Sequence, residues 1–431
     1  MSKRDQTKAR AKAYVDKVLL DSGISEEVRY IASYLHERPE ISSQEVESSR
    51  LLVEHLRRRG FAVAQDVAGL DTAFVAEKLV GSTKINGVER KGSTKPTSVA
   101  FLAEYDALPD LGHACGHNLI AAAAYGAAAA LSQIFSVETG SPELPDMGHF
   151  GPVKVVVFGT PAEESKGGKI VMADAGCFNG VDAAFYFHPG TQNVVGVPWL
   201  MSQTLTVTFH GRSAHAAVNP HKGINALTAV LVMFSSINGL RQNLPRGVLI
   251  NGIIKEGGRV VNIIPEYAEA DVEVRALSER DFREGIAAVK RSVEAGAVAT
   301  EARAAIRELA KYEAKVRIPA LDRLLRDILG EAGIPARIAD DSLARASSDA
   351  GNASRRMPIG DFMLAIAPRT TALHSAEFAK YAGSKEGIEA AVTAASVMAK
   401  AALEVIMEEG LKEEVNAQFK KGLEGTAEGG V

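Results

Sequence analysis

The chain has 431 residues, a formal net charge of −4 and two cysteines. We expect two domains, because a single hydrophobic core seldom grows beyond about 250–300 residues. Charges of both signs are interspersed along the chain, so we expect neither nucleic acid nor a membrane as a partner. With only two cysteines we do not expect a disulfide framework, and together with a charged N-terminal segment this favours a cytoplasmic protein.

The first part of the chain alternates helix and strand patterns. Hydrophobic periodicity predicts helices at 26–37 and 44–59, and short strands at 61–64, 72–77 and 97–103. The pattern next predicts a long helix at 117–135, a strand at 153–160, a helix at 166–176 and a strand at 183–188. Continuous apolar strands between helices are typical of a mostly parallel sheet that is covered on both faces.

Residues 111–137 contain no Asp, Glu, Lys or Arg, so a membrane span has to be considered. Much of this run is alanine, whose burial contributes little, and its first turn is crowded with polar residues. We therefore predict a buried helix behind a functional site.

The pattern changes near residue 201. TLTVTFHG, VLINGIIKEG and EYAEADVEVRA alternate like half-buried strands, helices are predicted at 223–243 and 279–298, and a final strand is predicted near 303–312. This β-α-β-β-α-β order predicts a small α+β lid or dimerisation domain at 201–314, inserted into a larger domain of residues 1–200 and 315–431. The larger domain resumes with a helix at 319–332, a strand at 365–367 and a helix at 384–408.

The segment AEYDALPDLGHACGHN at 103–118 concentrates metal-binding side chains. It holds two carboxylates, two histidines and a thiol within sixteen residues. Cys115 and His117 flank a single glycine, so a tight turn can direct both toward one ion, and thiolate and imidazole are good ligands for zinc, cobalt or manganese. Cysteine is also a common core residue, so this segment alone leaves a packed interior open as an alternative.

Further candidate ligands follow the predicted strands. Glu163 and Glu164 follow the strand at 153–160, His188 ends the strand at 183–188, and His374 follows the stretch MLAIAPRTT. Open α/β sheets bind ligands outside the carboxyl ends of their strands. Taken singly, the acidic pair could cap a helix and each histidine could belong to a turn. Taken together, five side chains fit a two-metal centre in which Glu163 is left to carry a proton: Cys115, His117, Glu164, His188 and His374.

Seven motifs lie in order along nearly the whole chain. They are LHERPEISSQE at 35–45, AEYDALPDLGHACGHN at 103–118, GTPAEESKGGK at 159–169, FHPG at 187–190, GRSAHAAVNPHKGINAL at 211–227, VVNIIPE at 260–266 and ALHSAEF at 372–378. This set resembles metallopeptidase family 20 of clan MH, which contains aminoacylases, carboxypeptidases and related amidohydrolases. Within that family the chain is most similar to the branch of aminobenzoyl-glutamate hydrolases and indole-acetyl amino-acid amidohydrolases.

The resemblance implies a role for each candidate residue. Cys115, His117, Glu164, His188 and His374 would be the metal ligands. Glu163 would be the general base, and Asp106 would orient a ligand histidine. In the inserted domain, His215 would stabilise the reacting oxyanion.

Substrate contacts are implied at Asn262 and Arg275, which correspond to positions that touch a substrate carboxylate. Asn352 lies in a stretch that matches the Asp-x-Gly-Asn pattern of the aminobenzoyl-glutamate branch, and His113 lies next to the metal loop. Two positions depart from close relatives. Glu104 stands where many members carry a metal-binding histidine, which leaves His117 to take that role, and Asn118 stands where aspartate is frequent.

The resemblance thus implies a hydrolase that cleaves the amide C–N bond of a small N-acyl, aminobenzoyl or dipeptide-like substrate with a carboxylate. It would use one or two divalent ions of manganese, zinc or cobalt and would form a homodimer through the inserted domain. Two alternatives stay open: hydrolytic deamination of an aromatic amine on the same centre, and a binding protein with a degenerate site. An assay for amino acid, ammonia or no product separates them.

Overall fold

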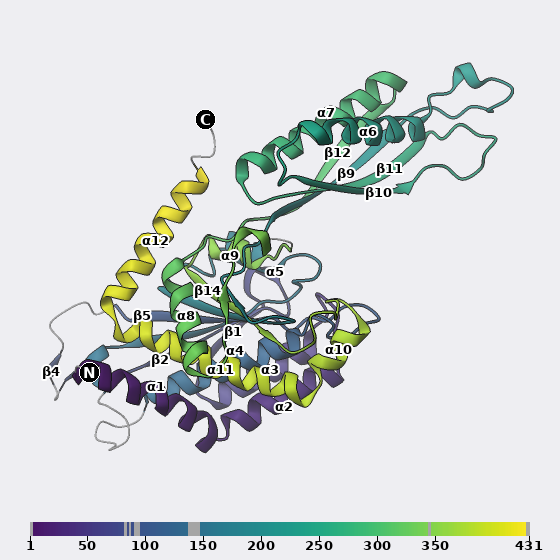
Figure 1. The fold of residues 1–431 in the computed structure, drawn as a ribbon. Helices are drawn as coiled ribbons and strands as arrows, with labels where there is room; N and C mark the ends of the chain where they lie inside the picture. The colour runs from purple at the N-terminus through teal and green to yellow at the C-terminus, as the bar shows by residue number, and fades with distance from the viewer. Residues whose placement is uncertain are drawn as a thin grey trace. The chain divides into compact units, whose positions relative to one another are not determined.

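The computed structural model describes residues 3–81, 84–85, 88–89, 95–136, 147–343 and 346–427. Its chain divides into two compact units (Figure 1). The first joins Met1–Pro198 to Val316–Leu343 and Asn352–Leu423, and the second is built on Trp199–Lys315. The larger unit is therefore assembled from segments on both sides of the smaller one.

The large unit is built on one mixed sheet. Its strands are β1 (Ala62–Gln65), β2 (Phe74–Val80), β5 (Thr97–Ala103), β6 (Val153–Gly159), β7 (Ala183–Gly190), β8 (Val194–Val195), β13 (Arg337–Ile338) and β14 (Ile359–Ala365). In the described residues they lie in the order β1-β2-β6-β5-β7-β14-β8-β13. The four central strands β6, β5, β7 and β14 are parallel, so their carboxyl ends meet at one edge of the sheet. The predicted mostly parallel sheet is confirmed.

Ten helices have all or most of their residues in this unit, and α3, α4, α8 and α11 contact the sheet directly. The ten helices of the described residues are α1 (Lys3–Asp21), α2 (Ile24–Glu37), α3 (Val46–Arg58), α4 (His117–Ile134), α5 (Gly168–Asp174), α8 (Pro319–Glu331), α9 (Ala350–Ser354), α10 (Ala376–Ala382), α11 (Lys385–Met407) and α12 (Glu409–Ala427). The charge-free run is the helix α4, which is buried along its length and packs against β5, β7, α2 and α11, as Figure 1 shows. The prediction of a buried helix is confirmed.

α11 is the one helix of the described residues that is long and apolar enough to cross a membrane by composition. About two thirds of its most apolar window, 67%, is buried inside the fold, where it contacts α4, α2, α1 and β7. A core helix has these same properties, so its apolar character is accounted for by packing.

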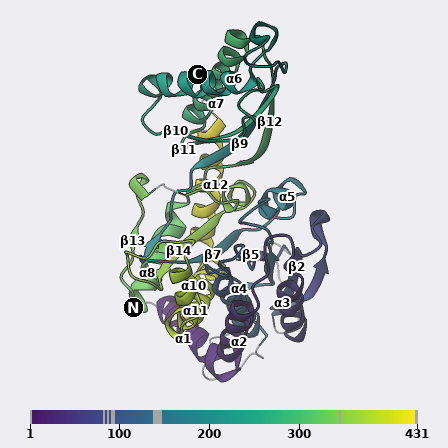
Figure 2. The same cartoon turned by 90° about the vertical axis from the view of Figure 1, so that its right-hand side faces the viewer.

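The second unit contains β9 (Met201–His210), α6 (Ala226–Leu240), β10 (Leu249–Glu256), β11 (Tyr267–Ala276), α7 (Glu279–Thr300) and β12 (Arg303–Tyr312). The predicted β-α-β-β-α-β order is confirmed. The strands form an antiparallel sheet in the order β10-β11-β9-β12. Alternate residues of β11 are buried, and α6 and α7 cover that face of the sheet (Figure 2).

In the first unit, a separate two-stranded sheet pairs β3 (Lys84–Ile85) with β4 (Val88–Glu89).

One predicted strand is misplaced. The strand expected at 365–367 is β14, which covers Ile359–Ala365 and shares only Ala365 with the prediction. Gly360 and the buried carboxylate of Asp361 interrupt the apolar run that would have marked the strand. The helices α1 and α12 have no counterpart in the prediction, because their sequences are mostly polar.

Candidate metal centre

The candidate site lies at the carboxyl edge of the four parallel strands. Glu104 and Asp106 follow β5, Glu163 and Glu164 follow β6, His188 lies two residues before the end of β7, and His374 comes after β14. Parallel neighbours end at the same edge, so segments far apart in the sequence deliver their side chains to one place.

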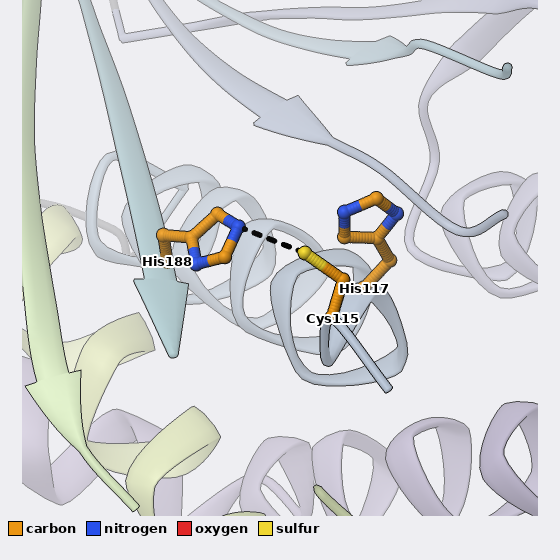
Figure 3. Close-up of side chains that lie close together, drawn as sticks. All are labelled: Cys115, His117 and His188. Carbon is orange, nitrogen blue, oxygen red and sulfur yellow. Dashed lines mark hydrogen bonds between the residues drawn. The ribbon is translucent and has the colours of Figure 1, made fainter. Parts of the chain in front are cut away.

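The turn before α4 directs two of the candidate ligands. Gly116 separates Cys115 from His117 and has a φ of +82°, which a side chain rarely tolerates. A Cβ at this position would lie 2.5 Å from Cγ of Pro189, so glycine is also required by close packing. In Figure 3, Cys115 and His117 lie at the start of α4 and His188 comes from β7. Cys115 Sγ lies 3.5 Å from His188 Nε2.

The candidate ligand atoms form overlapping groups whose members lie within 4.8 Å of one another. One group contains Cys115, His117 and His188, a second contains Cys115, Glu164 and His374, and a third contains His117, Glu163 and Glu164. The structure therefore brings together all five side chains expected to bind metal, with Glu163 beside them. Cys115, His117 and Glu164 each belong to two of these groups, so the three groups form one connected cluster.

Asp106 fixes the orientation of His117. The ring Nδ1 lies 2.8 Å from Asp106 Oδ1, and the other carboxylate oxygen accepts hydrogen bonds from Ser42 Oγ at 2.7 Å and from the Glu164 amide at 3.0 Å. Burial alone would raise the pKa of Asp106, but His117 and these donors hold it below its ordinary value. Asp106 therefore stays ionised and accepts the Nδ1 proton.

With its proton on Nδ1, His117 presents the Nε2 lone pair to the ligand groups. Nε2 is buried and has no hydrogen-bond partner among the described residues. A buried polar atom without a partner is costly unless something binds it. Glu104 and Glu164 place carboxylate oxygens 3.6 Å and 3.8 Å from this nitrogen, so a cation is the partner that the surroundings favour.

His188 is arranged in the same way. Its Nδ1 donates to the carbonyl of Pro189 at 2.7 Å, which leaves Nε2 unprotonated and facing Cys115. Burial lowers the pKa of His188, so the ring is held neutral. A neutral imidazole whose other nitrogen is hydrogen-bonded is the usual form of a metal-binding histidine.

His374 and Cys115 complete the donor set. His374 Nε2 lies 3.4 Å from Glu164 Oε1. The His374 amide donates to the Ala114 carbonyl at 3.0 Å, which joins the loop that carries His374 to the turn before α4 that carries Cys115. Burial raises the pKa of the Cys115 thiol, so a divalent cation would have to displace its proton. Three imidazoles, a thiolate and carboxylates are a donor set that fits zinc, cobalt or manganese.

A buried ion pair next to the ligands was not predicted from the sequence. Lys169 Nζ lies 2.6 Å from Glu104 Oε1, and both side chains are fully buried. The Tyr186 hydroxyl donates to Glu104 Oε2 at 2.8 Å. Lys169 ends the motif GTPAEESKGGK, but nothing in the sequence pairs it with Glu104, which lies 65 positions earlier. Lys169 balances the Glu104 charge, which would otherwise be an uncompensated buried anion.

Two further candidates in the large unit lie outside the ligand groups formed by the described residues. His113 is 2% exposed, and burial lowers its pKa to about 3. It is therefore a neutral interior side chain. Asn352 is half-buried on the short helix α9. Their substrate roles stay predictions.

The candidates in the second unit lie at opposite ends of its sheet. His215 is exposed, and its Nδ1 accepts hydrogen bonds from the amides of Ala217 and Val218 at 3.2 Å, so Nε2 carries the proton. Asn262 is on the neighbouring loop, where its carbonyl accepts from the Ala216 amide at 2.9 Å. Arg275 is near the far end of β11, about 25 Å along the strand, and pairs with Glu273 at 2.9 Å. One protomer therefore does not bring Arg275 to His215.

Comparison with known sequences gives two kinds of match. A peptidase dimerisation domain matches residues 201–317. The Xaa-Arg dipeptidase of Homo sapiens is 33% identical over 394 residues, which cover 90% of this chain and 87% of that protein. One of the p-aminobenzoyl-glutamate hydrolase subunits of Escherichia coli strain K12 is 30% identical over 290 residues, which cover 63% of this chain and 55% of that protein.

The fold is shared with solved structures. A dinuclear metal-binding peptidase of the M20 family from Bacillus subtilis superimposes with a TM-score of 0.65 at 20% identity, covering 90% of this chain and 99% of that chain. An aminobenzoyl-glutamate utilization protein from Klebsiella pneumoniae superimposes with a TM-score of 0.63 at 19% identity, covering 91% and 97%.

Because Cys115 belongs to two ligand groups, Cys115→Ala is expected to weaken metal binding at both positions, by at least about tenfold. The fold should persist, since the buried sheet and helices supply most of the stability. Elemental analysis after dialysis against buffered manganese, zinc or cobalt measures the bound metal. Cys177→Ala is the matched control, because Cys177 is outside every ligand group of the described residues. Equal metal content in a folded Cys115→Ala protein would remove the thiol from the ligand set.

Proposed function

Because this chain belongs to the M20 family of metallopeptidases, we propose that it hydrolyses the peptide bond of a small dipeptide with a free carboxylate. The observation that carries the proposal is the set of overlapping ligand groups that share Cys115, His117 and Glu164, one of which also contains Glu163. We further propose that one or two divalent ions of manganese, zinc or cobalt occupy these groups.

A bound ion at this position would polarise the substrate carbonyl and lower the pKa of the attacking water toward neutrality. Glu163 is half-buried, and its carboxylate lies within 4.8 Å of ligand atoms of His117 and Glu164. From there Glu163 accepts the proton of the attacking water and delivers it to the departing amine. Burial would raise the pKa of Glu164, but the hydrogen bond from His374 lowers it, so this side chain stays a carboxylate. The two neighbouring acids thus divide ligand and base roles.

We prefer a dipeptide to an aminobenzoyl amino acid as the substrate, because the alignment with a dipeptidase covers more of the chain than the alignment with an aminobenzoyl-glutamate hydrolase subunit. The human Xaa-Arg dipeptidase aligns with almost the whole chain, and the E. coli aminobenzoyl-glutamate hydrolase subunit with less than two thirds of it. The leading substrate is therefore a dipeptide with a C-terminal basic residue. Aminobenzoyl-glutamate is the second candidate, because it contains an amide between an aromatic acyl group and an amino acid.

We also propose that the protein is a homodimer whose second unit completes the partner's site. The matched dimerisation domain supports this assembly. The edge strand β10 exposes Leu249, Ile253 and Ile254, and an exposed apolar edge is suited to pairing with a second copy. In this assembly His215 would direct its Nε2 proton to the oxyanion of the partner's substrate, an effect worth about 3 kcal/mol for one donor.

The metal-loaded protein is expected to release free amino acid from Xaa-Arg or Xaa-Lys dipeptides. Amine release should be screened with these dipeptides, aminobenzoyl-glutamate, N-acetyl amino acids and amino-aromatic acids, with manganese, zinc or cobalt added. Glu163→Gln should lower kcat by about 10²–10⁴-fold, because an amide cannot take the proton of water at neutral pH. Its metal content should stay unchanged.

Two results would contradict this proposal. If the protein released ammonia from an aromatic amine and hydrolysed no amide, the bond that it cleaves would be the C–N bond of an amine and not a peptide bond. More than about a tenth of wild-type activity in a metal-replete Glu163→Gln protein would show that another group is the base, because loss of a general base costs at least ~10²-fold.

Mixing two inactive variants tests the partner's contribution. In a dimer of His215→Ala with Glu163→Gln, one site lacks both groups and the other has both. Subunit exchange of equal amounts should therefore restore about a quarter of wild-type activity, since half of the dimers are mixed and each has one intact site of two. Native mass spectrometry verifies the mixed dimer. Proven exchange without any recovery would mean that His215 acts within its own chain or has no catalytic role.

A further inference from the structure

The catalytic base proposed above lies on a turn with an unfavourable backbone conformation. Ala162, directly before Glu163, has a φ of +59° and is buried. This left-handed region is unfavourable for a residue with a side chain, so it persists only where surrounding contacts impose it. Glycine would adopt it freely, and its absence here indicates that other groups hold the turn.

A buried carboxylate from a distant part of the chain holds that turn. Glu45, which lies directly before α3 and is fully buried, accepts the Ala162 amide on Oε1 at 2.8 Å. The same oxygen accepts the Ser43 amide at 2.7 Å, and Oε2 accepts the Thr72 hydroxyl at 2.9 Å. Each carboxylate oxygen is thus engaged, so the position of Glu45 is itself fixed.

The residue after the base is held in the same manner. The Glu164 amide donates to Asp106, which also accepts the hydroxyl of Ser42. Glu163 therefore lies between two backbone amides that are each bound by a buried carboxylate. Glu45 binds the Ala162 amide, and Ser42 donates to Asp106, which binds the Glu164 amide. The short segment 42–45 therefore supports the backbone on both sides of Glu163.

We infer that Glu45 is a positioning residue for Glu163: it imposes the left-handed conformation of Ala162 and thereby directs the base at the attacking water. The inference rests on the proposed hydrolysis. It gives the LHERPEISSQE motif a role in which Glu45 acts through the backbone amide of Ala162. A displacement of the base by 1 Å is enough to cost about 10²-fold in rate.

Glu45→Met removes the acceptor and keeps the length of the side chain, so we expect kcat to fall by about 10²-fold with metal content and KM unchanged. Glu45→Gln keeps an acceptor oxygen for the two amides, and its NH₂ can donate to the Thr72 hydroxyl, so it should recover most of kcat. Thr72→Val is the matched control. It removes the other contact of Glu45 and should lower the melting temperature with little change in kcat.

A double-mutant cycle separates positioning from loss of folding. If Glu45 acts through Glu163, then adding Glu45→Met to Glu163→Gln should not reduce the residual rate further. Multiplicative losses, or a Glu45→Met protein with wild-type kcat, would overturn the inference.

Hydrogen exchange of the Ala162 amide gives a readout that needs no substrate. Exchange should be faster in Glu45→Met than in the wild type and should stay slow in Glu45→Gln. Unchanged protection in the Met variant would show that Glu45 does not hold the turn. If the wild type hydrolyses nothing in the screen, the proposed function fails, and the exchange measurement still decides whether the turn depends on Glu45.

Discussion

The Asp106 carboxylate is the contact on which the candidate site depends. It accepts hydrogen bonds from the ring of His117, the amide of Glu164 and the hydroxyl of Ser42. One buried anion thereby joins the metal loop, the turn with the acidic pair and the N-terminal segment. Because it takes the Nδ1 proton of His117, it also decides which nitrogen of that ring is available to a cation.

The charges around Asp106 explain why a cation is needed. Glu104, Glu163, Glu164 and Asp106 gather at one largely buried edge, and like charges in a medium of low polarity repel strongly. Lys169 compensates Glu104, and the hydrogen bonds to Asp106 stabilise its charge. The ligand groups around Cys115 consist of thiol, imidazole and carboxylate side chains. Divalent metal would supply the balancing charge, which ties the proposed chemistry to the electrostatics of the fold.

The sequence predicted the elements and the convergence of the candidate ligands better than the contacts that orient them. Cys115, His117, Glu164, His188 and His374 are marked by residue type and by their places after strands, so their convergence follows from a parallel sheet. Lys169 and Glu45 carried no such mark, because their roles arise from partners 65 and 117 positions away in the chain. The strand β14 was misplaced because a buried aspartate broke its apolar run. Arg275 could not be placed relative to His215 until strand register was known.

We propose that four parallel strand ends assemble one divalent-metal centre that includes Cys115. Anomalous diffraction from crystals grown with manganese, zinc or cobalt, collected at the metal absorption edge, would locate the bound ions. We expect one or two peaks at about 2.0–2.3 Å from Cys115 Sγ and from Nε2 of His117 or His188, the usual bond lengths of such ligands. Peaks only elsewhere on the molecule, or none at metal concentrations that support activity, would contradict it.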